Sequence, residues 1–142
     1  MEATRIQPHD AARRDGAGLL EEITRSVVGL YKDYLGQGPT KARTYICEDL
    51  VVCVLHGGFS KAERTLLDRG RVDAVIPQRR ALDDALRQPL SDTIERLVGR
   101  RVVGVTSAVE TAGELSTIVF LLERPGSANG AVSRLLSHAQ PA

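Results

Sequence analysis

Few side chains in this sequence have the types and spacing that catalysis or metal binding requires. The three histidines, His9, His56 and His138, stand far apart, and none has a second His or Cys at metal-ligand spacing on one helix or turn. The sequence contains no glycine-rich phosphate-binding motif and no nucleophile elbow. No two carboxylates stand out as an acid–base couple. We therefore expect no catalytic residue, no metal site and no cofactor.

The two cysteines flank an expected hairpin turn at Glu48-Asp49. A two-residue loop there pairs Cys47 with Leu50 and Thr44 with Cys53. Because side chains alternate between the faces of a strand, the two thiols point to opposite sides of the hairpin and cannot form a disulfide. We expect both to be buried free thiols.

Arginine supplies most of the positive charge, since only three of the 19 cationic residues are lysines. Arginine suits the binding of carboxylates and phosphates through two hydrogen bonds, but aspartates within helical reach explain most of these arginines as surface ion pairs. Arg79 differs, because it falls on the apolar stripe of a long expected helix. It is either a helix-edge residue whose guanidinium reaches water, or a buried and paired group.

One candidate binding segment covers residues 36–45. Arg43 and Tyr45 have the same parity in the expected strand, so their side chains share a face beside the loop of residues 36–39. A small ligand or anion could bind there. The alternative is architectural: a glycine ends the preceding helix, Pro39 directs the chain, and an edge strand follows.

The elements that position these residues follow from hydrophobic periodicity and from capping signals. Ser60 and Glu63 form a capping box, and Gly99 ends the long helix, in which Pro77 is tolerated and Pro89 is expected to cause a kink or a split. In chain order the expected elements are a helix over 19–35, strands over 43–47 and 50–55, a short helix over 61–68, a long helix over 72–98, and strands over 101–109 and 115–123.

The size and composition fit one domain. The chain has 142 residues, a net charge of +1 and 4% aromatic residues, which argues against a protein that coats nucleic acid. It holds no apolar run long enough to insert into a membrane and no secretory leader, so we expect a cytoplasmic protein. We expect a disordered lead-in over residues 1–16, one domain over 17–123 and a mostly disordered tail over 124–142.

The order helix, hairpin, helix, long helix, hairpin predicts an α+β fold with a four-stranded antiparallel sheet packed with helices. The first hairpin is apolar on both faces, although an antiparallel sheet with one face in water should alternate between apolar and polar residues. Either helices cover both faces or a second subunit covers one of them. We favour a homodimer.

A family resemblance rests on the segment Gly36-x-Gly38-Pro39-x-x-x-Arg43-Thr-Tyr-Ile46, followed by Asp49 leading an apolar strand, then Gly57 and Ser60-x-x-Glu63. These motifs are similar to those of the MpsC-like family, and the likeness spans residues 19–123. The sequence departs from the family pattern with Ser60-Lys61 in place of Thr-Pro, with Cys47-Glu48 at the turn, and with Pro77.

The resemblance implies a small soluble component of a bacterial system that translocates cations and generates a membrane potential. Together with Arg79, the residues matching the family pattern form our set of candidate ligand or partner contacts. These are Gly36, Gly38, Pro39, Arg43, Thr44, Tyr45, Asp49 and Arg79.

Two functions follow as hypotheses. The first is a non-enzymatic accessory or regulatory protein that works through protein contacts beside a membrane transport complex, cytoplasmic and held at the membrane by that partner. The alternative is a domain that senses a small ligand or anion through segment 36–45.

Overall fold

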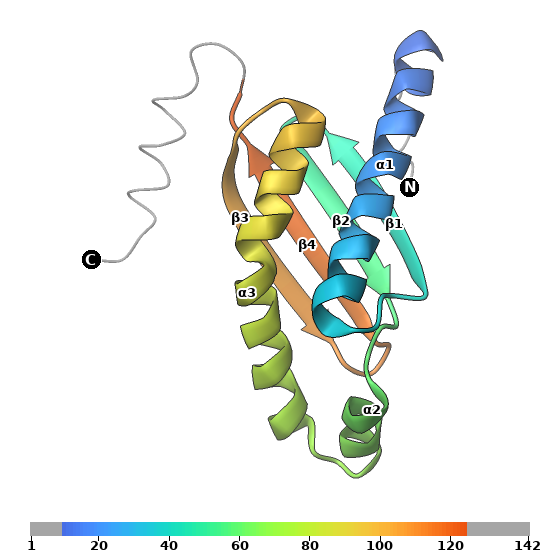
Figure 1. Cartoon of the computed structure of the whole chain (residues 1–142), viewed down its shortest axis with the longest axis vertical. Coiled ribbons are helices and arrows are strands. Elements are labelled where there is room, and N and C mark those ends of the chain that lie inside the picture. Colours follow the sequence, from blue (N-terminus) through green and yellow to red (C-terminus); the bar gives the residue numbers. More distant parts are fainter. Residues whose placement is uncertain (1–9, 125–142) are drawn as a thin grey trace, which may run out of the picture.

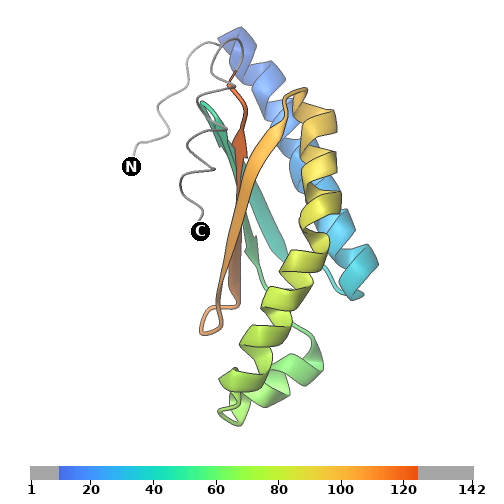
Figure 2. The ribbon, with the colours of Figure 1, turned by 90° about the vertical axis from the view of Figure 1, so that its left-hand side faces the viewer.

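The computed structural model describes residues 10–124, with side chains from Gly16 onward. In this range, helices pack against one face of a four-stranded antiparallel sheet (Figures 1 and 2), which confirms the predicted α+β class. The elements are α1 (Asp10–Leu35), β1 (Lys41–Cys47), β2 (Leu50–His56), α2 (Lys61–Asp68), α3 (Val72–Val98), β3 (Val102–Glu110) and β4 (Leu115–Leu122).

Helix α1 begins earlier than the sequence pattern indicated. Residues 10–16, expected to belong to a disordered lead-in, are helical. They include two alanines and two arginines, which favour helix, and they continue directly into the amphipathic segment, so the helix extends at little cost. Residues 1–9 and the expected tail from 125 onward, with His9 and His138, lie outside the described residues. The helix ends as predicted, with Gly36 at a φ of 78°.

The sheet has the strand order β1-β2-β4-β3. The predicted pairs Cys47–Leu50 and Thr44–Cys53 are confirmed by the register of the first hairpin. The face toward the helices carries the buried side chains of the sheet, which are Thr44, Val51, Cys53, Leu55, Ser116, Ile118, Phe120 and Leu122. The first four residues in that list come from the first hairpin, so its register decides which side chains enter the core.

The two thiols point to opposite faces, as expected, and both are free. Cys53 is buried in the core, where burial raises the pKa of its thiol to about 11. The expectation that both thiols are buried was wrong for Cys47, which is exposed. Cys47 ends the edge strand on the side of the sheet away from the helices, so no helix covers it.

Helix α3 runs without interruption from Val72 to Val98 through both prolines. Pro89 does not split it, because the flanking Leu86 and Leu90 are buried in the core and hold both halves against the sheet. Gly99 ends the helix in the left-handed conformation, as predicted. Helix α2 opens with the predicted capping box between Ser60 and Glu63.

The core lies between the sheet and the two long helices. Helix α1 contributes Ile23, Val27 and Tyr31, each at most 3% exposed, and α3 contributes a parallel apolar row. Figure 2 shows both helices on the same side of the sheet. No helix in the described part of the chain combines the length and apolar character needed to cross a membrane.

Candidate functional site

The loop of residues 36–39 packs against the loop that follows β2. A Cβ atom on Gly58, which has a φ of 86°, would lie 3.2 Å from the backbone of Pro39, and one on Gly38 would lie 3.4 Å from the carbonyl oxygen of Val28. Gln37 donates a hydrogen bond to the carbonyl of Phe59 (3.3 Å). These close backbone contacts give Gly38 and Pro39 a packing role.

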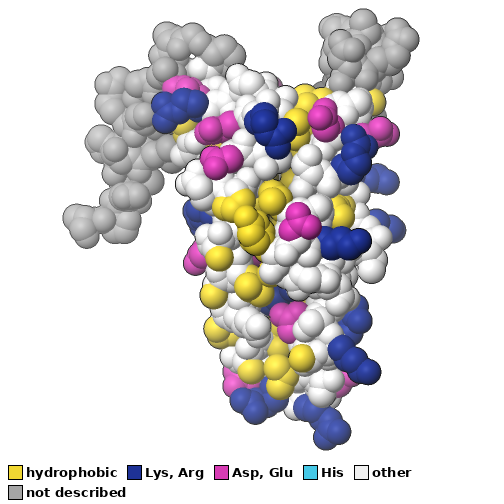
Figure 3. All heavy atoms as spheres, in the orientation of Figure 1, with side chains coloured by type: hydrophobic (Ala, Val, Ile, Leu, Met, Phe, Trp, Pro, Cys, Tyr) yellow, Lys and Arg dark blue, Asp and Glu magenta, His cyan; other side chains and the backbone are white. Residues whose placement is uncertain are grey.

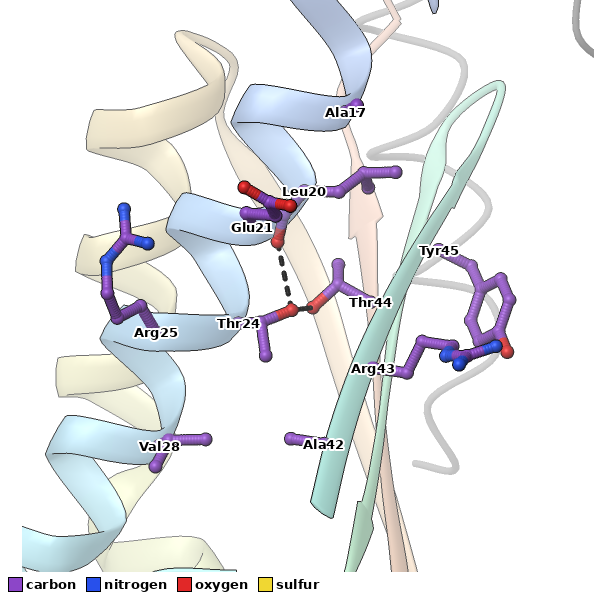
Figure 4. A pocket seen from close by; sticks show the side chains of 10 residues that line it. All are labelled: Ala17, Leu20, Glu21, Thr24, Arg25, Val28, Ala42, Arg43, Thr44 and Tyr45. Carbon is purple, nitrogen blue, oxygen red and sulfur yellow. Dashed lines mark hydrogen bonds between the residues drawn. The ribbon is translucent and has the colours of Figure 1, made fainter.

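The strand residues of the predicted segment divide between two faces. Arg43 and Tyr45 share a face, as predicted, and both are exposed. Figure 4 shows them projecting from the side of β1 away from α1, whereas Thr44 points toward the helix. The Thr44 hydroxyl lies 2.7 Å from that of Thr24, which in turn donates to the carbonyl of Leu20 (2.9 Å). The segment therefore contributes to two surfaces.

A groove of about 750 Å³ runs between α1 and the free edge of β1. It is lined mainly by apolar surface, and Glu21 and Arg25 border it on the side of α1. In Figure 4 the Arg25 side chain extends away from β1. The residues around it are Ala17, Leu20, Glu21, Thr24, Arg25, Val28, Ala42, Arg43, Thr44 and Tyr45. The groove thus lies directly beside an edge strand, a placement that the sequence pattern did not predict.

Asp49 lies at the opposite end of the first hairpin from the loop of residues 36–39. Its carboxylate accepts a hydrogen bond from Arg100 (2.8 Å) and another from Arg124, and these bonds lower the pKa of Asp49. Arg100 also donates to the carbonyls of Glu48 (3.3 Å) and Glu123 (2.9 Å). Asp49 therefore ties the turn of one hairpin to the end of the other, away from the remaining candidate residues.

Arg79 is buried and paired, which decides between the two interpretations of its position on the apolar stripe. Its side chain is 7% exposed and lies 3.4 Å from the Glu63 carboxylate, and its guanidinium stacks 4.1 Å from the ring centre of Phe59. Glu63 Oε1 also accepts the Ser60 N–H of the capping box (2.8 Å). The other Glu63 oxygen is buried with no hydrogen-bond partner among the described residues, so Arg79 is the main compensation for this carboxylate.

A second polar contact lies one turn further along α3. Tyr31 of α1 donates a hydrogen bond to Asp83 (3.2 Å). Burial raises the pKa of Asp83, and burial together with the Asp83 charge raises the pKa of Tyr31. This contact joins α1 to α3 inside the helical layer. Its hydrogen bond holds the two helices together.

The side of the sheet away from the helices, here called the open face, is apolar across its middle. The pairing register places the following side chains on it, with the charged ones on the edge strands: Lys41, Arg43, Tyr45, Cys47, Leu50, Val52, Val54, His56, Thr106, Ala108, Glu110, Leu115, Thr117, Val119 and Leu121. Tyr45 and Leu50 are 46% and 38% exposed. The helix side carries charges of both signs spread over its surface, with hydrophobic side chains between them (Figure 3). No helix of residues 10–124 covers the open face (Figure 2).

The predicted site residues thus do not form one constellation. The side chains of Arg43 and Tyr45 project onto the open face, although both residues also border the groove; Thr44 points into the groove, and the other positions hold loops or ion pairs. Within residues 16–124, no three potential metal ligands gather. Sequence reasoning missed Thr24 and Arg100. Thr24 gave a weak signal, as a polar residue beside the apolar stripe of α1, and Arg100 gave none.

A comparison with protein families matches residues 17–124 to a family model described as Na+-translocating membrane potential-generating system (MpsC). The match covers most of the chain and nearly all of the described fold. No curated protein and no solved structure matches the chain.

Proposed function

The chain belongs to the MpsC family, and from this premise we propose that it is a non-enzymatic accessory or regulatory component of a Na+-translocating membrane potential-generating system. It acts through protein contacts, lies in the cytoplasm, and reaches the membrane through its partner. The open face makes the contact with that partner.

The observation that carries this proposal is the composition of the open face. An antiparallel sheet with one face in water usually carries polar side chains there. Here the two central strands, β2 and β4, present leucines and valines, with one threonine and with His56 at the end of β2, and Tyr45 adds a half-exposed ring at the edge. Contiguous apolar surface of this kind is typical of protein contact sites.

The use of the charged groups supports a role without catalysis. Glu63 and Arg79 neutralise each other inside the protein, and Asp49 holds Arg100 at a joint between the hairpins. A general acid or base needs a free position facing substrate. The carboxylates of these pairs already serve the fold.

The homodimer expected from the sequence is part of this proposal. Two copies in one complex are consistent with an edge strand and an apolar face on the same small domain, because both features favour association. Light scattering coupled to size exclusion measures the copy number directly.

Deleting the gene in its own host tests the accessory role. We expect the Na+-dependent membrane potential, followed with a potential-sensitive dye, to fall and to return when the wild-type chain is supplied. The double variant Leu50→Glu/Val52→Glu places two charges on the open face and should not restore it. The matched control is Tyr34→Glu, which changes a tyrosine that is 59% exposed on α1 and should restore the potential.

Two results would count against the proposal in different ways. An unchanged membrane potential in the deletion strain contradicts the role in this system. Full restoration by the open-face variant, with its fold verified by circular dichroism, contradicts the open face as the contact surface.

The anion-sensing alternative retains one supporting observation, the exposure of Arg43 and Tyr45 on the same face. Inorganic phosphate should then raise the melting temperature of the wild-type chain but not of Arg43→Ala. If neither protein responds to phosphate, segment 36–45 has no anion site of this kind.

A further inference from the structure

The two edges of the sheet can be compared through the direction of their backbone groups. The N–H of Leu122 donates to the carbonyl of Asp49 (2.7 Å), which fixes which residues bond across the β2–β4 pair. Because bonded and non-bonded positions alternate along antiparallel strands, the odd-numbered residues of β2 bond to β4 and the even-numbered ones to β1. The register then leaves Ala42, Thr44 and Ile46 of β1 with their N–H and C=O groups directed away from the sheet.

Strand β3, at the opposite edge, has two features that hinder pairing with a further strand. Its register shifts between Val102 and Gly104, which is a β-bulge, and Arg87 of α3 donates to the carbonyl of Val105 (3.1 Å). Bulges and side chains placed on the edge prevent the addition of further strands. Strand β1 keeps one register over all seven residues, so it is the edge open to pairing.

The groove between α1 and β1 gives an added strand somewhere to place its side chains. A strand that pairs with β1 turns alternate side chains toward the helix layer, and therefore into the groove lined by Leu20, Val28 and Ala42. Ile46, which is 36% exposed, lies on the same side of β1 as Ala42 and Thr44. The exposed edge thus carries both a large apolar side chain and the apolar space to receive one.

We propose that two copies of the chain pair through β1, antiparallel about a two-fold axis at Thr44, to form one continuous eight-stranded sheet. This inference rests on the homodimer part of the proposed function. It assigns the contact between copies to the edge and groove, and leaves the open face to the other partner.

The register at Thr44 is the one that the side chains favour. It uses all three outward-facing residues of β1, and it places Ile46 opposite the partner's Ala42, a large residue against a small one. It also sets Arg43 opposite the partner's Tyr45, a pairing that permits a cation–π contact. An axis at Arg43 would place two like charges directly opposite each other, which is destabilising. An axis at Tyr45 would leave Ala42 unpaired.

The helical wall of the groove has matching charges. The hydrogen bond between Thr24 and Thr44 (2.7 Å) places Thr24 of α1 close to the proposed axis. Glu21 and Arg25 line the groove one turn apart, and neither forms an ion pair with another described residue. Two antiparallel copies of α1 that cross at Thr24 bring Glu21 toward the partner's Arg25, twice in each dimer.

A disulfide cross-link tests this register with the native Cys47. At an axis on Thr44, position 41 faces the partner's Cys47 in a non-hydrogen-bonded pair, with Cα atoms about 4.5 Å apart, within disulfide range. Within one copy the two positions end the same seven-residue strand, roughly 20 Å apart. The oxidised variant Lys41→Cys should therefore run as a covalent dimer without reductant.

Matched variants make the cross-link specific. Lys41→Cys combined with Cys47→Ser should stay monomeric on the same gel, and so should Arg43→Cys, whose position faces the partner's Tyr45. Efficient cross-linking of Arg43→Cys would overturn the register. In solution, Ile46→Pro removes an outward N–H that one copy does not use, so the apparent mass should fall by half with an unchanged circular dichroism spectrum. A dimer that survives this change would overturn the edge contact.

The failures of the two proposals can be told apart. A wild-type chain that is monomeric by light scattering overturns the edge contact together with the homodimer. A dimer that cross-links through Val52→Cys on the open face, but not through Lys41→Cys, overturns the edge contact alone. The loss of Na+-dependent membrane potential in the deletion strain measures the accessory role independently of both.

Discussion

Replacing Arg79 by methionine should destabilise the domain strongly, because the guanidinium compensates a buried carboxylate. The Arg79 and Glu63 side chains are both 7% exposed and their charged atoms lie 3.4 Å apart. Methionine keeps most of the apolar stem of arginine, so the packing is largely conserved. The change removes the charge from beside Glu63 and the cation from the face of Phe59.

The magnitude follows from these two losses. Removing one partner of a buried ion pair costs about 3–5 kcal/mol, since the other charge is left in a medium of low polarity. Losing the cation–π contact adds about 1 kcal/mol. We therefore expect Arg79→Met to lower the free energy of unfolding by about 4–6 kcal/mol. For a domain of this size, this corresponds to a fall in melting temperature of roughly 15 °C.

Urea unfolding followed by circular dichroism measures this change, and a double-mutant cycle assigns it to the pair. Glu63→Gln keeps an acceptor for the capping box but removes the buried negative charge. The double variant should then be more stable than the sum of the single effects predicts, by at least about 1.5 kcal/mol. Arg80→Met changes the neighbouring exposed arginine and should stay within about 0.5 kcal/mol of wild type.

Two results would refute this reasoning. A loss below about 1 kcal/mol for Arg79→Met would mean that the guanidinium reaches water and leaves Glu63 hydrated. Additive effects in the cycle would mean that Arg79 stabilises the domain through packing, without coupling to Glu63.

Three further predictions concern single side chains. Under native conditions at pH 8, iodoacetamide should alkylate Cys47 and leave Cys53 unmodified until the protein unfolds, because burial raises the pKa of Cys53 to about 11; mass spectrometry of peptides locates the label. Burial raises the pKa of Asp83 in the folded protein. Protonation of Asp83 therefore stabilises the folded state in full below about pH 3.9, the ordinary pKa of an aspartate. This stabilisation is lost as the pH rises through the folded-state pKa. The melting temperature of Asp83→Asn minus that of wild type should therefore increase between about pH 4 and pH 7. A difference that stays constant over this range would contradict the reasoning. Gly58→Ala should lose about 1–3 kcal/mol and more than Gly70→Ala, since both glycines have positive φ but only the first faces a neighbouring backbone within 4 Å; equal losses in thermal unfolding would contradict the close contact.

The fold was predictable because local signals and the hydrophobic pattern agree. The turn at Glu48 fixed the register of the first hairpin, and the capping box at Ser60 fixed the start of α2. The strand order could not be predicted, since pairing between β2 and β4 depends on contacts distant in sequence. The continuity of α3 through Pro89 also required the tertiary packing, which holds a helix that the local preference would weaken.

The candidate site was predicted only in part, for reasons that differ between residues. Parity correctly placed Arg43 and Tyr45 on one face, but parity does not tell which face the helices cover. The position of Arg79 on an apolar stripe left two interpretations open, because its partner Glu63 lies on another helix and already had a role in a cap. Asp49 could not be connected with Arg100, since 51 residues separate them.

The two proposed surfaces are compatible because they use different parts of β1. Pairing through the strand edge uses the outward backbone groups of β1 and the groove on the helix side. The open face lies on the opposite side of the sheet, where Arg43 and Tyr45 project (Figure 4). A two-fold axis perpendicular to the sheet keeps both open faces on the same side of the dimer. Edge pairing therefore joins two apolar faces into one larger surface for the partner. Loss of the edge contact should then weaken partner binding through the smaller joined area, whereas charges on the open face should leave the copy number unchanged.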